Sequence, residues 1–142
     1  RRQGYRQAMS DLGLAPIEFA WPSLDTAQIA PLLAQSLHAG GQLGYTALIA
    51  CNDLAAINAV YAIQEMGYSI PHDVSVVGFD DIDMAAIVRP ALTTNRVERE
   101  LLGVYGVRRL IERAHDNETP PMAITFSTRL IERDSVRRIG AG

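Results

Sequence analysis

The sequence contains no lysine, a single cysteine and no long apolar run, and each absence narrows the possible functions. All 13 basic residues are arginine, so no lysine amine can form a Schiff base or act as a nucleophile. Cys51 has no second cysteine with which to form an internal disulfide, and we expect a small buried thiol. No apolar stretch approaches the roughly 20 residues of a membrane helix, and the first residues lack the apolar segment of a signal peptide. A cytoplasmic protein without membrane contact is predicted.

Positive charge is also scarce in this chain. The 13 arginines face 16 acidic residues, which gives a net charge of −3. Nucleic-acid binding requires a dense positive surface, so any contact with DNA must come from residues outside this sequence. At 142 residues, 48% hydrophobic and 20% charged, the chain suffices for one globular domain with its own core.

Helical and strand patterns alternate along the chain. Apolar residues recur with helical spacing at 1–12, 26–38, 54–66, 83–88 and 98–114. Short apolar or alternating runs typical of strands occur at 17–20, 46–51, 74–79, 92–95 and 124–130. This alternation predicts an α/β fold, a Rossmann-like parallel sheet with helices on both faces. The helix at 98–114 is expected to bury one apolar stripe, made of Val97, Leu101, Val104, Val107, Ile111 and Ala114.

Polar side chains follow two of the predicted strands at their carboxyl ends. Asn52 and Asp53 follow the first, and Asp80 and Asp81 follow the second. Ligands of open parallel sheets bind at this edge, so a ligand site is predicted here. Together with Asp83, the two later carboxylates resemble a Mg²⁺ or phosphoryl site. However, the sequence has no glycine-rich phosphate loop, no nucleophile elbow and no metal-spaced histidine pair, so neither an enzyme nor a cofactor or metal is predicted.

Five segments carry a more specific pattern. They are R-x-x-G-Y at 1–5, A-C-N-D-x-x-A at 50–56, G-x-x-I-P-x-D-V-S-V-V-G-F-D-D at 67–81, P-x-L-T-T at 90–94 and R-L-I-E-R-D-S at 129–135. In this order they resemble the effector-binding core of the LacI/GalR family of bacterial transcription regulators. The resemblance implies a periplasmic-binding-protein-like fold of two lobes, with a small effector bound between them.

The resemblance also implies a division of the chain. Residues 1–90 look like most of the C-terminal effector-binding lobe, incomplete at its N-terminus. Residues 91–142 look like crossover elements, a strand, a helix and a C-terminal strand, that return toward the N-terminal lobe. Such regulators bind operator DNA through an N-terminal helix-turn-helix, which this sequence lacks. We therefore expect the chain to be part of a longer repressor.

Four residues match ligand-binding positions of that family, and each has a plainer alternative. Asp80 is expected to accept hydrogen bonds from ligand hydroxyls or amines, and the alternative is a turn or cap residue. Arg1 is expected to reach the ligand with its planar guanidinium, or else to be solvated. Asn52 is either a cleft amide or a helix cap. Trp21 is either an aromatic wall for the ligand or part of a surface cluster. Asp81 is expected to be a cap or loop residue.

Apolar positions on two helices match the homodimer interface of the family. The alternative is that they belong to the core of a single chain. The expected interface residues are Leu54, Ile57, Tyr61, Met84, Ile87 and Val88.

The favoured function is a ligand-sensing domain for a sugar or sugar derivative that controls operator binding. The alternatives are a periplasmic sugar-binding protein of a transporter and, less favoured, the acidic-cluster enzyme.

Overall fold

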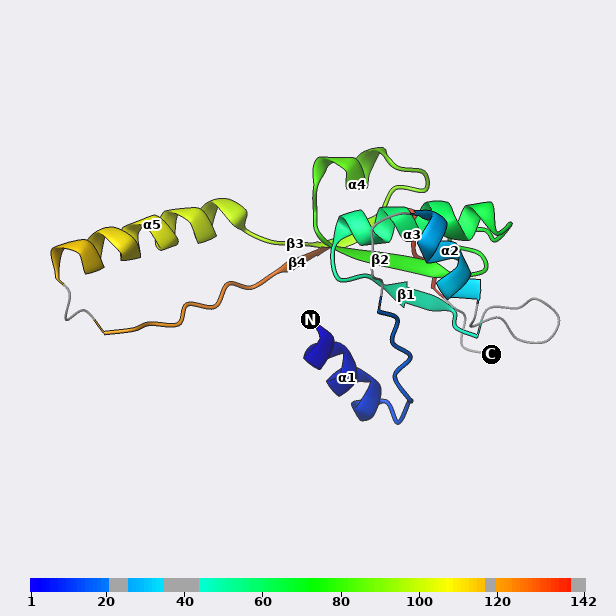
Figure 1. Cartoon of the computed structure of the whole chain (residues 1–142), viewed down its shortest axis with the longest axis horizontal. Helices are drawn as coiled ribbons and strands as arrows, with labels where there is room; N and C mark the ends of the chain where they lie inside the picture. Colours follow the sequence, from blue (N-terminus) through cyan, green and yellow to red (C-terminus); the bar gives the residue numbers. More distant parts are fainter. Residues whose placement is uncertain (21–25, 35–43, 117–119, 139–142) are drawn as a thin grey trace.

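A four-stranded sheet forms the centre of the protein in the computed structural model, which describes residues 1–20, 26–34, 44–116 and 120–138 (Figure 1). The strands lie in sequence order, β1 (Ala47–Ile49), β2 (Ser75–Asp80), β3 (Thr93–Arg96) and β4 (Arg129–Ile131). β1, β2 and β3 are parallel, and β4 pairs with β3 in the antiparallel direction. The predicted parallel α/β sheet is confirmed, with one antiparallel strand at its edge.

Five helices surround or extend from this sheet in the described part of the chain. They are α1 (Arg2–Asp11), α2 (Thr26–Ala34), α3 (Asp53–Glu65), α4 (Asp83–Ile87) and α5 (Arg99–His115). α3 packs on β2 and α2 packs on α3, whereas α1 lies on the other side of the sheet (Figure 1). α3 ends just before Gly67, whose φ of +86° turns the chain out of the helix. The turn lets the Tyr68 amide donate to the Ile63 carbonyl at 3.1 Å.

The hydrophobic core lies between the sheet and helices α2 and α3. Both helices bury aliphatic side chains that are fully inaccessible to solvent, and the strands add the residues that face them. Burial of each such side chain contributes about 1.5–3 kcal/mol. The largest fully buried apolar residues are Ile29, Leu33, Val60, Ile63, Val74, Val76 and Leu92. This core holds the carboxyl ends of β1 and β2 in fixed positions.

The segment at 17–20, predicted as a strand, is irregular. The backbone amide and carbonyl of Ile17 bind a side chain instead of a neighbouring strand. The Tyr5 hydroxyl donates to the Ile17 carbonyl and accepts from the Ile17 amide, each at 3.1 Å. The carboxylate of Glu18 binds Arg2 and Arg6, and these hydrogen bonds lower its pKa to about 2. The segment is therefore tied to α1.

The predicted helix near 98–114 is present as α5, but its apolar stripe is not buried. Leu101, Val104, Val107 and Ile111 are each 45–57% exposed, because α5 projects away from the sheet and no described helix or strand covers it (Figure 1).

The last strand is also shorter than the predicted 124–130. β3 has only four residues, and its last one, Arg96, pairs with Arg129, so residues before 129 have no strand to join.

A buried serine joins β2 to β3. Ser135 is fully buried, and its hydroxyl donates to the Val76 carbonyl at 2.6 Å and accepts from the Thr93 amide at 2.8 Å. We expect Ser135→Ala to lower the free energy of unfolding by about 2–4 kcal/mol, because each buried group left unpaired costs about 1–3 kcal/mol. Urea unfolding measures this change. Ser127→Ala, at an exposed position, should leave the midpoint unchanged, and equal effects would contradict the assignment.

Candidate functional site

Arg1 and Asp80 meet at the carboxyl edge of the sheet. One terminal nitrogen of Arg1 (Nη2) pairs with Asp80 Oδ1 at 3.0 Å, and the other (Nη1) donates to the Cys51 carbonyl at 2.5 Å. The guanidinium carbon lies 4.0 Å from the centre of the Phe79 ring. The two charged side chains remain 48% and 31% exposed. A ligand can therefore reach a hydrogen-bond donor and an acceptor that lie side by side.

The other expected ligand contacts have different positions. Asn52 is half-buried and caps α3, since its side-chain oxygen accepts from the Ala55 amide at 2.8 Å. This geometry matches the capping alternative. Trp21 lies outside the described residues. The prediction that Cys51 is a buried thiol is wrong, because the side chain is exposed. Its neighbour Ala50 is buried, so the chain turns Cys51 away from the core.

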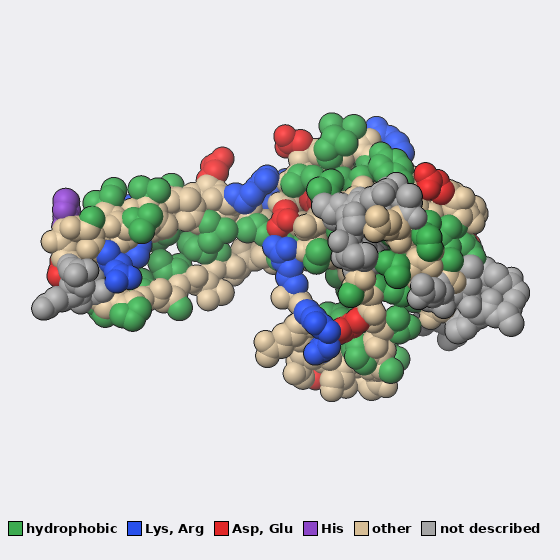
Figure 2. All heavy atoms as spheres, viewed as in Figure 1, with side chains coloured by type: hydrophobic (Ala, Val, Ile, Leu, Met, Phe, Trp, Pro, Cys, Tyr) green, Lys and Arg blue, Asp and Glu red, His purple; other side chains and the backbone are tan. Residues whose placement is uncertain are grey.

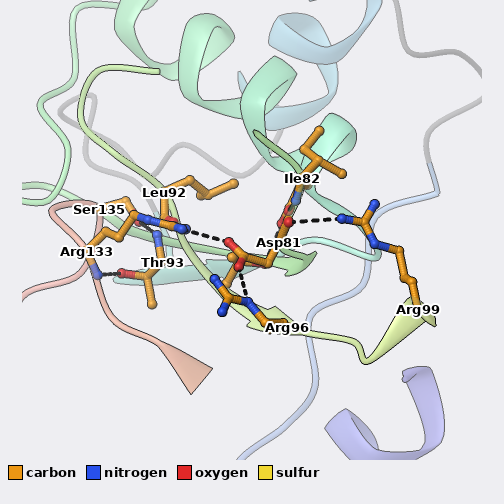
Figure 3. Close-up of polar contacts among 10 residues, drawn as sticks. Asp81, Ile82, Leu92, Thr93, Arg96, Arg99, Arg133 and Ser135 are labelled. Atoms are coloured by element: carbon orange, nitrogen blue, oxygen red, sulfur yellow. Dashed lines mark hydrogen bonds and ion pairs between the residues drawn. The ribbon is translucent and has the colours of Figure 1, made fainter. Parts of the chain in front are cut away.

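Asp81 lies in the loop between β2 and α4, as expected, but it binds two arginines rather than capping a helix. Its side chain is 4% exposed and pairs with Arg96 Nε at 2.5 Å and with Arg133 Nη2 at 2.7 Å (Figure 3). Burial acts to raise the pKa of the Asp81 carboxyl, but the hydrogen bonds and charges of Arg133 and Arg96 outweigh it and lower the pKa. The sequence contained no local signal for this pairing, because the partners are 15 and 52 residues away.

The low pKa of Asp81 predicts an acid-sensitive fold. A carboxyl whose pKa is lower in the folded state stabilises the protein above its unfolded pKa of about 3.9 and loses that contribution as pH falls through the folded value. We expect the wild type to lose more stability than Asp81→Asn between pH 5 and pH 2.5, measured by urea unfolding. Glu18 titrates in both proteins, so the difference isolates Asp81. Parallel losses would contradict this account.

Asp53 is a second carboxylate whose role the sequence did not reveal. It is fully buried, and it accepts from the Ile82 amide at 2.8 Å and from the Thr94 hydroxyl at 2.5 Å. Gly78 makes room for it, because a Cβ at that position would lie 2.2 Å from Asp53 Oδ1. Asp53 thus ties α3 to β3 and to the residue that follows Asp81.

The backbone of Asp80 and Asp81 is left-handed. Their φ angles are 114° and 55°, a region that costs a residue other than glycine on the order of 1–3 kcal/mol. Such strain persists only where the surroundings enforce it. Here the Asp53 carboxylate holds Ile82 on one side, and Arg96 and Arg133 hold Asp81 itself. The direction of the Asp80 carboxylate is therefore set by its neighbours.

The acidic residues near this edge do not form a metal site. Within the described residues, no group of three or more His, Cys, Asp and Glu side chains is arranged to hold a metal ion. Asp80 and Asp81 instead pair with different arginines, and Asp83 is exposed on α4. None of the described helices combines the length and the apolarity needed to cross a membrane.

The expected dimer residues divide into two groups. Leu54, Tyr61, Met84 and Ile87 are 44–62% exposed on α3 and α4, and Figure 2 shows hydrophobic side chains gathered over α4. Ile57 and Val88 are 4% and 3% exposed. These two were expected at an interface, but they pack inside the chain and offer no surface to a second copy, which is the core alternative.

Comparison with known proteins places this architecture. Residues 1–136 match the periplasmic binding protein-like domain family. The lactose operon repressor of Rhizobium radiobacter is 40% identical over 95 residues, which cover 67% of this chain and 83% of that protein. The HTH-type transcriptional repressor PurR of Mannheimia succiniciproducens is 36% identical over 66% of this chain and 28% of that protein. A LacI-family regulator structure from Sanguibacter keddieii matches with TM-score 0.81 and 31% identity, over 94% of this chain and 52% of that one.

The sheet, its helices and its polar carboxyl edge define a periplasmic binding protein-like domain. The chain belongs to this family in the form found in LacI-type transcriptional regulators. It spans about half the length of the regulator structures it matches, 52% and 49% for two of them. The resemblance stated from the sequence motifs is confirmed.

Proposed function

We propose that this chain is the ligand-sensing part of a LacI-type regulator and binds a sugar or sugar derivative at the Asp80–Arg1 pair. The observation that carries the proposal is this pair, 3.0 Å apart and open to solvent. A carboxylate accepts from two neighbouring hydroxyls and a guanidinium donates to ring or hydroxyl oxygens. The relatives support this class of ligand, since one is a lactose operon repressor and one similar structure is a regulator complex with cellobiose.

The proposed regulation needs a ligand with different affinities for two conformations of the protein. A ligand that binds both equally shifts no population. The lobe of residues 1–90 would close on the effector against a second lobe, to which residues 91–142 cross over. The exposed apolar stripe of α5 supports this crossing, because a helix that is apolar on a broad face requires a cover. DNA binding by a helix-turn-helix outside this sequence would then change by the reciprocal coupling.

A role in transport uses the same fold, but the similar curated proteins are repressors, and this favours the regulator.

A thermal-shift screen of the full-length protein against sugars, sugar acids, polyols and nucleosides tests the proposal. A compound at 100 times its Kd adds about 2.7 kcal/mol of stability. Stabilisation by a sugar or sugar acid supports the proposal, and the absence of stabilisation by any of these compounds contradicts it.

The proposed regulator acts as a homodimer through the exposed apolar residues of α3 and α4. A twofold interface uses one patch on both subunits, and Leu54, Tyr61, Met84 and Ile87 supply such a patch. We expect Ile87→Asp to weaken dimerisation by about tenfold or more, because an apolar anchor contributes at least about 1.4 kcal/mol. Sedimentation velocity measures the change.

Leu14→Asp is the matched control for this variant, since Leu14 is 54% exposed but lies beyond α1. It should leave the dimer intact. A dimer that survives Ile87→Asp and dissociates with Leu14→Asp would move the interface to the other side of the sheet.

A further inference from the structure

Asp81 links the sheet edge that carries Asp80 to the two segments that join α5 to the sheet. Arg96 is the last residue of β3, through which the chain leaves for α5, and Arg133 lies just after β4, through which it returns. One carboxylate binds both arginines, at 2.5 and 2.7 Å. Figure 3 shows the two side chains converging on Asp81 from separate segments. Arg133 also donates to the Leu92 carbonyl at 2.7 Å, so the returning segment is bound to the start of β3 as well.

The same residue is joined to Asp80 by the strained turn. Both residues have positive φ angles, so a rotation of the backbone at Asp81 redirects the Asp80 carboxylate. The far side of the turn is held by Asp53 through the Ile82 amide. A movement of the two connections therefore either displaces Asp81 or breaks its ion pairs, in addition to any effect through the β2–β3 ladder, in which Arg96 pairs with Asp80.

We propose that Asp81 is a positioning residue that couples the direction of the Asp80 carboxylate to the placement of the β3 and β4 connections. The inference rests on the proposed function, in which Asp80 binds the effector and the connections lead to a second lobe. Asp81 itself touches no ligand in this scheme. The charge of Asp81 holds the outgoing and returning segments together. Its backbone orients Asp80, so that a displacement of the two segments changes the direction of the Asp80 carboxylate.

Hydrogen exchange of the full-length protein without any ligand tests the coupling. Asp81→Asn removes the charge and keeps a residue type that tolerates left-handed backbone. We expect exchange to rise about tenfold or more in peptides that cover 80–82, 93–99 and 129–134, while α3 stays protected. Asp83→Asn removes an exposed carboxylate of α4 and should change none of them. Arg96→Gln, a milder variant that keeps the Arg133 pair, should loosen the outgoing segment and the turn.

Two results would overturn the inference. One is an exchange increase in Asp81→Asn that spares the turn at 80–82, and the other is an equal increase in α3, which would reflect general destabilisation. The thermal-shift screen with sugars and sugar acids tests the proposed function separately. If no compound stabilises the wild type, the proposed function is contradicted, whereas the exchange pattern is measured without ligand and still decides the role of Asp81. With a compound that stabilises the wild type, Asp81→Asn should bind it more weakly than the wild type does, and binding should no longer slow exchange in the peptides of β3 and β4.

Discussion

Replacement of Gly78 by alanine is expected to lower the free energy of unfolding by about 3 kcal/mol, near the upper end for an added methyl group in a packed core. The added Cβ would lie 2.2 Å from Asp53 Oδ1 and 2.9 Å from Leu92 Cδ2. Neither atom can move at low cost, because Leu92 and Asp53 are both fully buried and the Asp53 carboxylate binds Thr94 and Ile82. Its displacement would leave those two donors unpaired.

Thermal and urea unfolding measure the effect, and the expected loss corresponds to roughly 6–12 °C in Tm for a chain of this size. Gly103→Ala is the matched control, since nothing lies within 4 Å of its added Cβ in the exposed helix α5. That variant should be neutral or more stable by up to about 1 kcal/mol, through helix propensity. Equal stabilities for the two alanine variants would show that Gly78 is not constrained by Asp53.

Replacement of Asp80 by asparagine is expected to reduce affinity for the effector by about 100-fold or more. Each hydrogen bond to a charged group contributes about 1.5–3 kcal/mol, and two such bonds exceed the 2.8 kcal/mol that corresponds to 100-fold. Asparagine keeps the shape of the side chain and tolerates the left-handed backbone at this position. Calorimetric titration with a compound that stabilises the wild type measures the loss.

The fold of this variant should be little changed. The Arg1–Asp80 pair is exposed at both ends, and exposed pairs contribute only about 0–1 kcal/mol. Asp83→Asn removes a nearby exposed carboxylate and should bind with wild-type affinity. Unchanged affinity in Asp80→Asn, or equal losses in both variants, would remove Asp80 from the site.

Sequence patterns predicted the elements whose signals are local. The continuous apolar runs before Asn52 and before Asp80 form the parallel neighbours β1 and β2, and the helical spacing at 54–66 corresponds to α3. Arg1 and Asp80, which the family resemblance assigned to a ligand site, form an ion pair in the structure, and their role toward a ligand stays a prediction. These features depend on periodicity, on caps or on motifs that stand together in the chain.

The errors arose where distant residues decide the structure. Asp53 was expected at the ligand edge beside Asn52, but it is buried, and its partners Ile82 and Thr94 lie 29 and 41 residues away. The stripe of α5 has helical spacing, yet burial requires a covering surface, and no described helix or strand supplies one. Of the described residues, only the irregular segment that contains Phe126 lies beside this helix, where Phe126 contacts Tyr105. Cys51 was assigned to the core from the habits of its residue type, whereas its exposure depends on which way the chain leaves β1.

The most direct test of the ligand site is backbone NMR of the full-length protein with the stabilising panel compound. Chemical-shift changes locate a ligand without any assumption about regulation. The account predicts that the largest changes fall at 51–53 and 79–82, together with the start of α1, at the edge where Arg1 meets Asp80. Changes confined to α5 or to the exposed apolar residues of α3 and α4, with residues 79–82 unmoved, would contradict it.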